Sequence, residues 1–441
     1  MGRQKILGIW SLFFWKRNKV MTSPVAITGM GIISSLGLGI PRFRDALLKG
    51  ESQFAQHHDP ILSFPVVAAL IQPFSFLDVL TEFSWLSPSR CQSLIKLMRG
   101  APLTVQTALL AALEAWQQAE LDRSPLDSRR IGLIIGAQNT TSHYQYHLYA
   151  KFQQQPDYLS PTYALHFMDS DHIGILSEAF GIRGEGFIVG GASASSQIAL
   201  LRAYQLIVSG AMDACMVIGA LADLSPMEIQ GFHNLGALGG HHFINQPHKA
   251  CRPFDRAHEG FIYGQAAACL IVESTQSAKK RSCFVEGYML GGAALLDGNH
   301  LSDPSVEGEC DVMQQAVDST GIRVQDINYI NTHGTASPLG DQTEIKAIET
   351  FLGAHTQHVF LNSTKSIVGH CLWSAGAVEA IATLLQIQEG FIHPTLNLDH
   401  PISEVCQFIT GKSQFARVNT ALSNGFGFGG INTTIVFSKE V

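Results

Sequence analysis

The sequence of 441 residues lacks the cysteine pairs, basic blocks and long apolar segments that mark several common classes of protein. Its eight cysteines are scattered without a CxxC pair, which argues against a disulfide framework or a cysteine-based zinc site. The net charge of −7 and the lack of a basic stripe argue against nucleic-acid binding. We therefore expect a globular, cytoplasmic protein with reduced cysteines and with no metal or organic cofactor of its own.

The first twenty residues differ from the rest. They carry five basic residues and no acidic one, around the apolar run Ile6–Trp15. That run is too short to cross a bilayer core, which needs roughly 20 residues, and no small-residue cleavage site follows it. Three interpretations remain: a start site assigned too early, with Met21 as the true start, a disordered tail, or an interfacial anchor. Because the run is apolar nearly all round, we favour the first and treat residues 1–20 as an extension outside the fold.

Beyond this segment, helix and strand patterns alternate. Residues 25–28 read as a strand that enters a glycine-rich turn at 29–31, and residues 103–119 show helical spacing before a strand at 131–135. The same order of helix, link and strand returns around 312–330. This repetition predicts an internally duplicated α/β fold. Because no flexible linker separates the halves, we expect them to pack as one unit.

A strand, turn and helix in the first half form a candidate active-site element. The strand ends at Phe187–Val189, a tight turn follows, and a helix is predicted over Ser193–Ser209, closed by Gly210. A side chain at the start of a helix lies beside unpaired N–H groups, where a nucleophile or an oxyanion is stabilised. The alternative is that Ser193 or Ser195 simply caps the helix.

Three polar or glycine-rich segments in the second half strengthen the catalytic interpretation. One polar turn carries His333, and another, over residues 363–370, ends in His370 before a helix predicted at Ser374–Glu389. The loop Ser423–Asn432 contains four glycines, so its backbone N–H groups can approach a ligand closely.

In order and spacing, these segments resemble the β-ketoacyl synthases of fatty-acid and polyketide assembly, from about Val25 to Phe437. The landmarks are Val25–Gly31, Pro253-Phe254-Asp255, Gly260-Phe261, His333-Gly334-Thr335, Lys365 to His370, Glu379 and Gly427–Asn432. The resemblance implies a duplicated thiolase fold of five layers, α/β/α/β/α, that usually forms a homodimer. It also implies an N-terminal half at 21–275 and a C-terminal half at 276–441.

One position departs from the family pattern. The family carries its condensing cysteine seventeen residues before the glycine that ends the helix, and here that residue is Ser193. A helix N-terminus contributes roughly 0.3–2 kcal/mol, enough to tune a thiol but not to ionise an alcohol. The resemblance therefore implies that self-acylation and chain elongation are lost.

The remaining parts imply a decarboxylase. In the family, the residues matched by His333 and His370 stabilise the enolate left when a malonyl thioester loses CO2. Backbone N–H groups at Ser193 and Phe428, in the loop that includes Gly429, match the oxyanion hole. Lys365 matches a lysine near the second histidine, and Glu379 matches its charge partner.

The combination is similar to the ketosynthase-like decarboxylases of polyketide β-branching, which also have serine in place of cysteine. These convert malonyl-acyl carrier protein to acetyl-carrier protein for a hydroxymethylglutaryl-synthase-like enzyme. The phosphopantetheine arrives on the carrier protein.

Two other functions stay open from sequence: an acyltransferase or hydrolase that uses Ser193 as nucleophile, and a silent partner subunit of an active ketosynthase. Trp373, where the family has a small residue, either narrows the active-site pocket or packs in the core.

Overall fold

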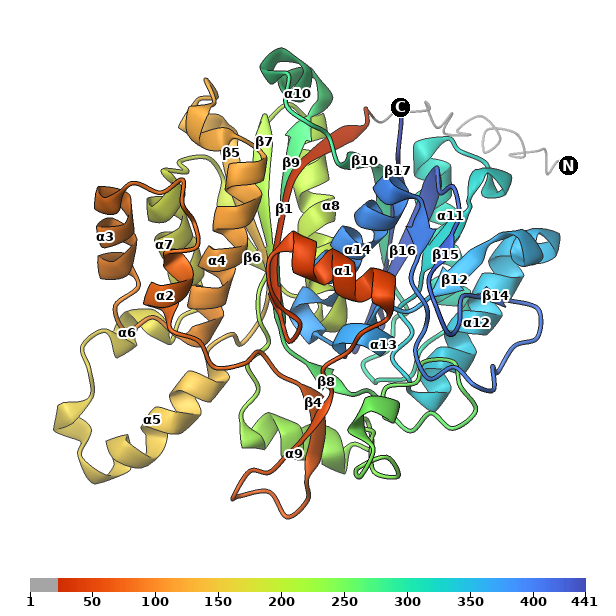
Figure 1. Cartoon of the computed structure of the whole chain (residues 1–441), viewed down its shortest axis with the longest axis horizontal. Helices are drawn as coiled ribbons and strands as arrows, with labels where there is room; N and C mark the ends of the chain where they lie inside the picture. Colours follow the sequence, from red (N-terminus) through yellow and green to blue (C-terminus); the bar gives the residue numbers. More distant parts are fainter. Residues whose placement is uncertain (1–22) are drawn as a thin grey trace, which may run out of the picture.

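The computed structural model describes residues 23–441, so the predicted extension at 1–20 lies outside the described residues. Within this range, most strands join one mixed sheet of 12 strands (Figure 1). Its order is β14-β12-β11-β16-β17-β10-β1-β9-β7-β5-β6, with β2 paired to β1.

The two halves of this sheet repeat one arrangement. In the first half, β1 pairs antiparallel with β9, β9 pairs antiparallel with β7, and β7, β5 and β6 are parallel. In the second half, β10, β17, β16, β11 and β12 follow the same order with the same directions. The strands of the first half are β1 (Val25–Ser34), β5 (Ile131–Gly136), β6 (Gly186–Val189), β7 (Ala214–Gly219) and β9 (Ala266–Ser274). Those of the second are β10 (Gly287–Leu296), β11 (Tyr329–Asn331), β12 (Phe360–Asn362), β16 (Thr420–Gly427) and β17 (Ile431–Ser438), with β14 (Gln407–Phe408) added at the edge. The predicted duplication is confirmed.

Helices lie in three layers around the two half-sheets (Figure 1). The helix α4 (Leu103–Gln118) covers the outer face of the first half, and α11 (Val306–Thr320) and α12 (Pro338–Leu352) cover that of the second. Between the halves, α8 (Ser195–Val208) packs against α14 (Ala375–Glu389). Helix α14 is buried all round from Ala375 to Ile387, as expected for a helix between two sheets. This is the predicted five-layer α/β/α/β/α thiolase fold.

Strand β1 differs from the sequence-based expectation. The sequence predicts a turn at residues 29–31, but the strand continues through them to Ser34, with a register shift between Ile27 and Gly29. A Cβ at Gly29 would lie 2.1 Å from the carbonyl oxygen of Ala115, and one at Gly31 would lie 2.0 Å from that of Ala111. The two glycines therefore allow α4 to pack directly on the strand backbone.

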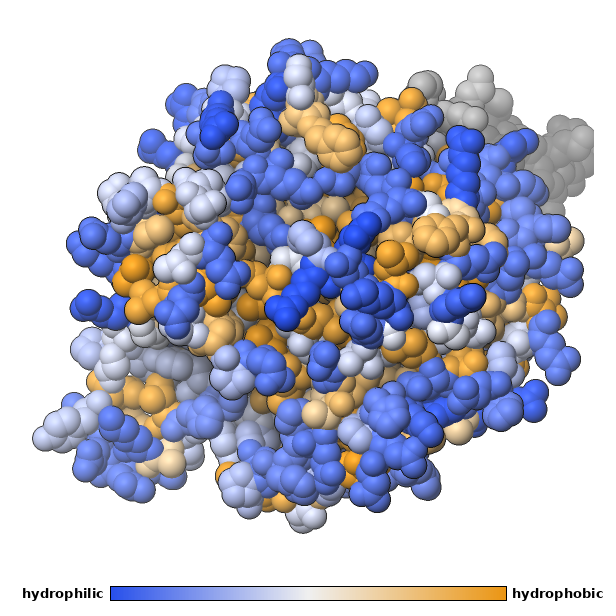
Figure 2. Space-filling model, viewed as in Figure 1, coloured by the Kyte–Doolittle hydropathy of each residue, from blue (hydrophilic) through white to orange (hydrophobic). Residues whose placement is uncertain are grey.

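Smaller elements complete the described part of the chain. They are α1 (Ile40–Lys49), α2 (Phe76–Leu80), α3 (Pro88–Leu97), α5 (Ser142–Gln154), α6 (Tyr163–His166), α7 (Ser170–Phe180), α9 (Pro226–Asn234), α10 (Thr275–Arg281), α13 (Lys365–Val368), β2 (Gly37–Leu38), β3 (Ala55–His57), β4 (Val66–Ala69), β8 (Tyr263–Gly264), β13 (Phe391–Ile392) and β15 (Gln414–Phe415). Within residues 23–441, every helix is too short or too polar to cross a membrane. On the face of the molecule in Figure 2, hydrophilic residues predominate, and hydrophobic residues lie in small groups between them.

Candidate active site

Ser193 lies in a short 3-10 turn, Ala192–Ala194, that precedes α8. The regular helix begins at Ser195, two residues later than predicted, because Ala192 adopts a left-handed φ of 46°. Ser195 stabilises this turn, since its Oγ accepts the N–H of Gly191 at 2.9 Å and donates to the carbonyl of Ala192 at 2.7 Å. No side chain caps α8, so the alternative that Ser193 or Ser195 caps this helix is wrong.

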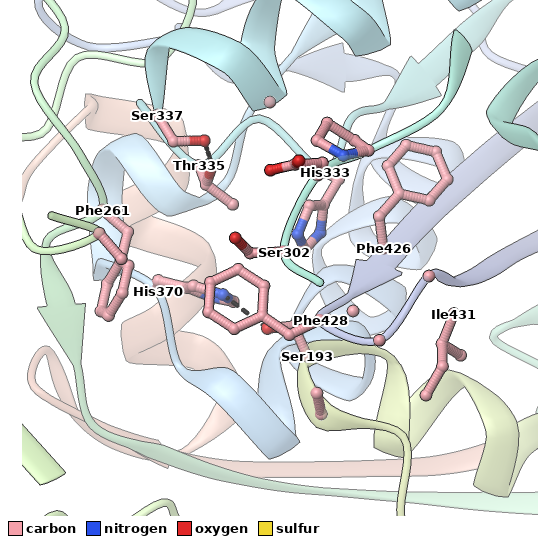
Figure 3. Close-up of a pocket in the computed structure, with 18 of the residues that line it drawn as sticks. Ser193, Phe261, Ser302, His333, Thr335, Ser337, His370, Phe426, Phe428 and Ile431 are labelled. Carbon is pink, nitrogen blue, oxygen red and sulfur yellow. Dashed lines mark hydrogen bonds between the residues drawn. The ribbon is translucent and has the colours of Figure 1, made fainter. Parts of the chain in front are cut away.

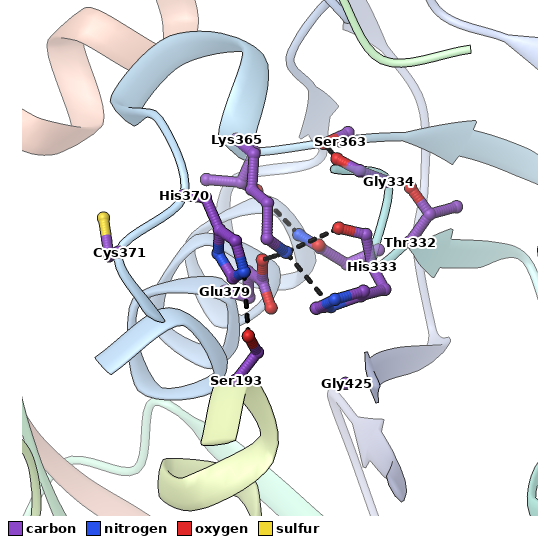
Figure 4. A network of polar contacts seen from close by, with 12 residues as sticks. Ser193, Thr332, His333, Gly334, Ser363, Lys365, His370, Cys371, Glu379 and Gly425 are labelled. Atoms are coloured by element: carbon purple, nitrogen blue, oxygen red, sulfur yellow. Dashed lines mark hydrogen bonds and ion pairs between the residues drawn. The ribbon is translucent and has the colours of Figure 1, made fainter. Parts of the chain in front are cut away.

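The hydroxyl of Ser193 contacts His370 instead (Figure 4). Its Oγ lies 2.8 Å from Nε2 of His370, while Nδ1 of the same ring accepts the backbone N–H of Leu372 at 3.4 Å. A neutral imidazole that accepts at one nitrogen carries its proton on the other. The proton of His370 is therefore on Nε2, which donates to Ser193.

His333 follows β11 and is oriented by groups on both sides. Its backbone N–H donates to Glu344 Oε1 at 2.7 Å, and the N–H of Gly334 donates to the other oxygen of that carboxyl at 2.7 Å. The ring Nδ1 lies 3.3 Å from Nζ of Lys365, an ammonium that can only donate. Nε2 of His333 therefore carries the proton as well.

Lys365, on α13, contacts His333 rather than its sequence neighbour His370. Its Nζ donates to His333 twice, to ring Nδ1 and to the carbonyl oxygen at 2.5 Å, and it forms a buried ion pair with Glu379 of α14. The three donors of the ammonium thus meet three acceptors (Figure 4). This arrangement fixes the position and the tautomer of His333.

Burial keeps both imidazoles neutral. It lowers the pKa of His333 and of His370 well below the usual 6.5, and the nearby Lys365 lowers both further. Burial also raises the pKa of Glu379 to about 7, although Lys365 opposes the change. The pKa of Glu344 is raised to about 7 by burial, against the hydrogen bonds from Gly334 and His333. At neutral pH, the two histidines are uncharged donors.

The two rings face one cavity of about 860 Å³ that also holds Ser193 (Figure 3). The ring centroids of His333 and His370 are 5.5 Å apart and nearly perpendicular, at 85°. Phe261 packs edge-on against His370 at 5.4 Å, and Phe426 lies 5.5 Å from His333. Two Nε2–H donors therefore converge on one space, held there by aromatic neighbours.

The glycine loop meets the serine turn directly. A Cβ added at Gly427 would lie 2.5 Å from the carbonyl oxygen of Gly191 and 3.4 Å from the backbone nitrogen of Ser193. Only glycine allows this approach, which places Phe428 at the cavity beside Ser193 (Figure 3). The N–H of Gly429 donates to the carbonyl of Leu301 at 3.1 Å, so Gly429 shapes the loop and does not offer a free donor.

The structure thus brings the five predicted side chains together in two hydrogen-bonded groups. Ser193 contacts His370, Lys365 contacts His333 and Glu379, and the two histidine rings are adjacent. Sequence reasoning misses Glu344 and gives no role to Phe261 or Phe426. A signal for Glu344 exists, because it is an acidic residue among the apolar positions of α12 and needs a buried partner.

Within residues 23–441, no group of three or more His, Cys, Asp or Glu side chains could hold a metal ion. The adjacent His241 and His242 contact groups of the protein: His241 Nε2 lies 3.1 Å from the carbonyl oxygen of Leu238, and His242 Nδ1 lies 2.9 Å from Glu259 Oε1.

Comparison with known proteins identifies the family of the chain. The family model for the N-terminal domain of β-ketoacyl synthases matches residues 98–278, and the model for the C-terminal domain matches residues 287–399. The polyketide biosynthesis malonyl-ACP decarboxylase PksF of Bacillus subtilis is 39% identical over 413 residues, which are 93% of this chain and 95% of that protein.

Two further relatives extend the comparison. The 3-oxoacyl-[acyl-carrier-protein] synthase 2 of Coxiella burnetii is 30% identical over 94% of this chain and 98% of its own length. The crystal structure of a β-ketoacyl synthase from Burkholderia phymatum superimposes with a TM-score of 0.83 at 25% identity, covering 95% of this chain and 99% of that one.

Proposed function

Because the chain belongs to the β-ketoacyl synthase family but has Ser193 at the position of the condensing cysteine, we propose that it decarboxylates malonyl-acyl carrier protein without condensation. The product is acetyl-carrier protein. One observation carries the proposal: Nδ1 of His333 and Nδ1 of His370 each face a donor of the protein, and both rings line the cavity that contains Ser193. This arrangement leaves Nε2 of each ring to donate into the cavity.

The reaction needs only groups that this site contains. The bond between the malonyl carboxylate and C2 breaks, and CO2 leaves. The electron pair of that bond moves into the thioester to form an enolate. The two Nε2–H groups donate to the developing enolate oxygen, which they stabilise without giving up a proton. C2 then takes a proton from solvent, which yields the acetyl thioester. Lys365 and Glu379 act through His333, whose ring they position.

The tautomer of His370 argues against a serine nucleophile. A serine hydroxyl needs a general base to take its proton when it attacks a thioester. His370 Nε2 donates to Ser193 Oγ and so cannot accept that proton, while Nδ1 is occupied by the N–H of Leu372. His333 has its own Nδ1 engaged by Lys365. Neither imidazole of the site is therefore in a state to activate Ser193.

Carrier-protein delivery fits the composition of the cavity. Three hydroxyl residues, Ser302, Thr335 and Ser337, line it together with the histidines (Figure 3). Such hydroxyls can bond the amide groups of a phosphopantetheine arm. We propose that this arm carries the malonyl group to the histidines, and that a condensing enzyme of the hydroxymethylglutaryl-synthase type consumes the acetyl product. The eight free cysteines fit a reducing compartment such as the cytoplasm.

The exposed edge of the sheet supports a homodimer. Within the described residues, β6 ends the sheet and pairs only with β5. An unpaired edge is a template for pairing with a second chain. Residues 149–168, which include α6 and the end of α5, also expose large apolar side chains, namely Tyr149, Phe152, Tyr158, Leu165, Phe167 and Met168. A second copy would cover both features, and light scattering after size exclusion tests this directly.

The function is tested by incubating the purified protein with malonyl-carrier protein and recording the intact mass. We expect loss of the mass of CO2, with no metal or second protein added, and no further change when the substrate is acetyl-carrier protein. Decarboxylation by the protein alone also rejects the silent-subunit interpretation. A malonyl mass that stays unchanged after long incubation would reject the proposed function.

A further inference from the structure

Ser193 has a structural counterpart in the second repeat of the fold, and that counterpart is Trp373. Ser193 is the middle residue of the 3-10 turn Ala192–Ala194 before α8, and Trp373 is the middle residue of the 3-10 turn Leu372–Ser374 before α14. Both turns begin with a non-glycine residue at positive φ, 46° at Ala192 and 52° at Leu372. The duplicated fold thus presents two equivalent side chains at the starts of its two central helices.

Both side chains line the same cavity. Trp373 is 9% exposed and belongs to an apolar cluster that contains Leu372 and Phe261, with Phe232 packed against it. All four residues line the cavity, and Phe261 is in edge-on contact with His370. They form an apolar wall, with the indole of Trp373 as its largest member. The space beside Ser193 and His370 is limited by this wall.

We propose that Trp373 sets the size of the acyl group that the site accepts, so that a malonyl group fits and larger acyl groups are excluded. An enzyme that does not store a growing chain on residue 193 has no need for space beyond it. A tryptophan side chain is a large and rigid filler with only two side-chain torsions. One methylene of mismatch in an apolar pocket changes selectivity by roughly 10–200-fold. The inference about malonyl rests on the proposed function.

The first test compares malonyl-carrier protein with a 2-butylmalonyl-carrier protein in the parent and in Trp373→Ala. The parent should favour malonyl by at least about 100-fold in kcat/KM, and Trp373→Ala should reduce that preference by at least about tenfold. Trp85→Ala, which removes a tryptophan outside the cavity, is the matched control and should leave the preference unchanged. An equal preference in the parent and Trp373→Ala, with both folded by circular dichroism, would overturn the proposal.

The second test does not depend on decarboxylation. Ser193→Cys introduces a thiol that an acyl thioester can modify, and intact mass reports the adduct. The single variant should accept an acetyl group from an acetyl thioester but no octanoyl group, whereas Ser193→Cys with Trp373→Ala should accept both. Octanoylation of the single variant would contradict a limit set by Trp373. If malonyl-carrier protein is not decarboxylated but this difference in octanoylation appears, the proposed function fails and the size limit stands.

A folding defect in Trp373→Ala would not leave the proposal undecided. Trp373→Phe and Trp373→Leu retain apolar volume and form a graded series. The selectivity for malonyl should fall in the order Trp, Phe, Leu if the size of residue 373 decides it. The same selectivity in all folded variants would assign Trp373 to core packing alone.

Discussion

The hydroxyl oxygen of Ser193 lies 2.8 Å from Nε2 of His370, on the side of the ring that carries the proton. The serine is thus an acceptor of a hydrogen bond from the histidine, the reverse of the relationship in a serine hydrolase. When a thioester oxygen replaces the hydroxyl as acceptor, the same Nε2–H can stabilise an enolate.

The Ser193→Ala variant should keep its decarboxylase activity. Its backbone N–H remains, and the Nε2–H of His370 becomes free for the substrate. We expect a rate within about tenfold of the parent, a change of about 1.4 kcal/mol in the barrier. The measurement is single-turnover loss of CO2 from malonyl-carrier protein.

An acyl-serine mechanism makes the opposite prediction for Ser193→Ala. Its chemistry begins at the serine oxygen, so the variant would lose several orders of magnitude in rate. Mass spectrometry of the parent trapped during turnover gives a second readout. A malonyl or acetyl adduct on Ser193 would contradict the present account.

Lys365→Met should lower stability more than most buried substitutions. It leaves Glu379 buried without its charge partner and releases the ring and carbonyl of His333. Breaking one side of a buried ion pair costs roughly 3–5 kcal/mol in the free energy of unfolding. Urea denaturation measures this loss, and Lys365→Met with Glu379→Leu should recover part of it. Equal stability of Lys365→Met and the parent would show that the ion pair between Lys365 and Glu379 does not stabilise the fold.

The low pKa of His370 predicts a pH-dependent difference between the parent and His370→Asn. Because the folded pKa of His370 lies below the usual 6.5, its contribution to stability is present above pH 6.5 and is lost as pH falls. The asparagine side chain of the variant takes up no proton, so the variant avoids this loss. When the pH falls from 6.5 to 5.5, the free energy of unfolding of the parent should therefore decrease by about 1 kcal/mol more than that of the variant. Denaturant titrations at the two pH values test this, and a constant difference would contradict the assignment.

Much of the fold is predictable because its signals are local. The helix predicted at 103–119 is observed as α4, Leu103–Gln118, and the strand predicted at 131–135 is observed as β5, Ile131–Gly136. Both predictions rest on the spacing of apolar residues that are close together in the sequence. The glycines near residue 30 lead to a wrong prediction of a turn, because a glycine that breaks a strand and a glycine inside a strand look the same in the sequence. These positions need glycine because α4 packs on the strand there, and α4 lies about 80 residues away in the chain.

The candidate site is predictable as a set of residues but not as a set of proton positions. Ser193, His333 and His370 follow from motif spacing, whereas the tautomer of each ring depends on contacts with Leu372 and Lys365. The acidic character of Glu344 among apolar positions indicates that it needs a buried partner, but the sequence does not say which one. Two of its partners are backbone N–H groups, which no motif reveals, and the third is the side chain of Asn424. For Trp373, the sequence leaves pocket narrowing and core packing open, and only the fold shows that this residue is equivalent to Ser193.

In the proposed reaction, the two histidines, and not the serine, stabilise the enolate. The most direct measurement is the rate of CO2 loss from malonyl-carrier protein by His333→Ala and by His370→Ala, each checked for folding by circular dichroism. Removal of one such donor commonly costs roughly 10²–10³ in rate, so each variant should be at least about 100-fold slower than the parent. Rates near that of the parent in both variants would contradict the account and place the chemistry elsewhere.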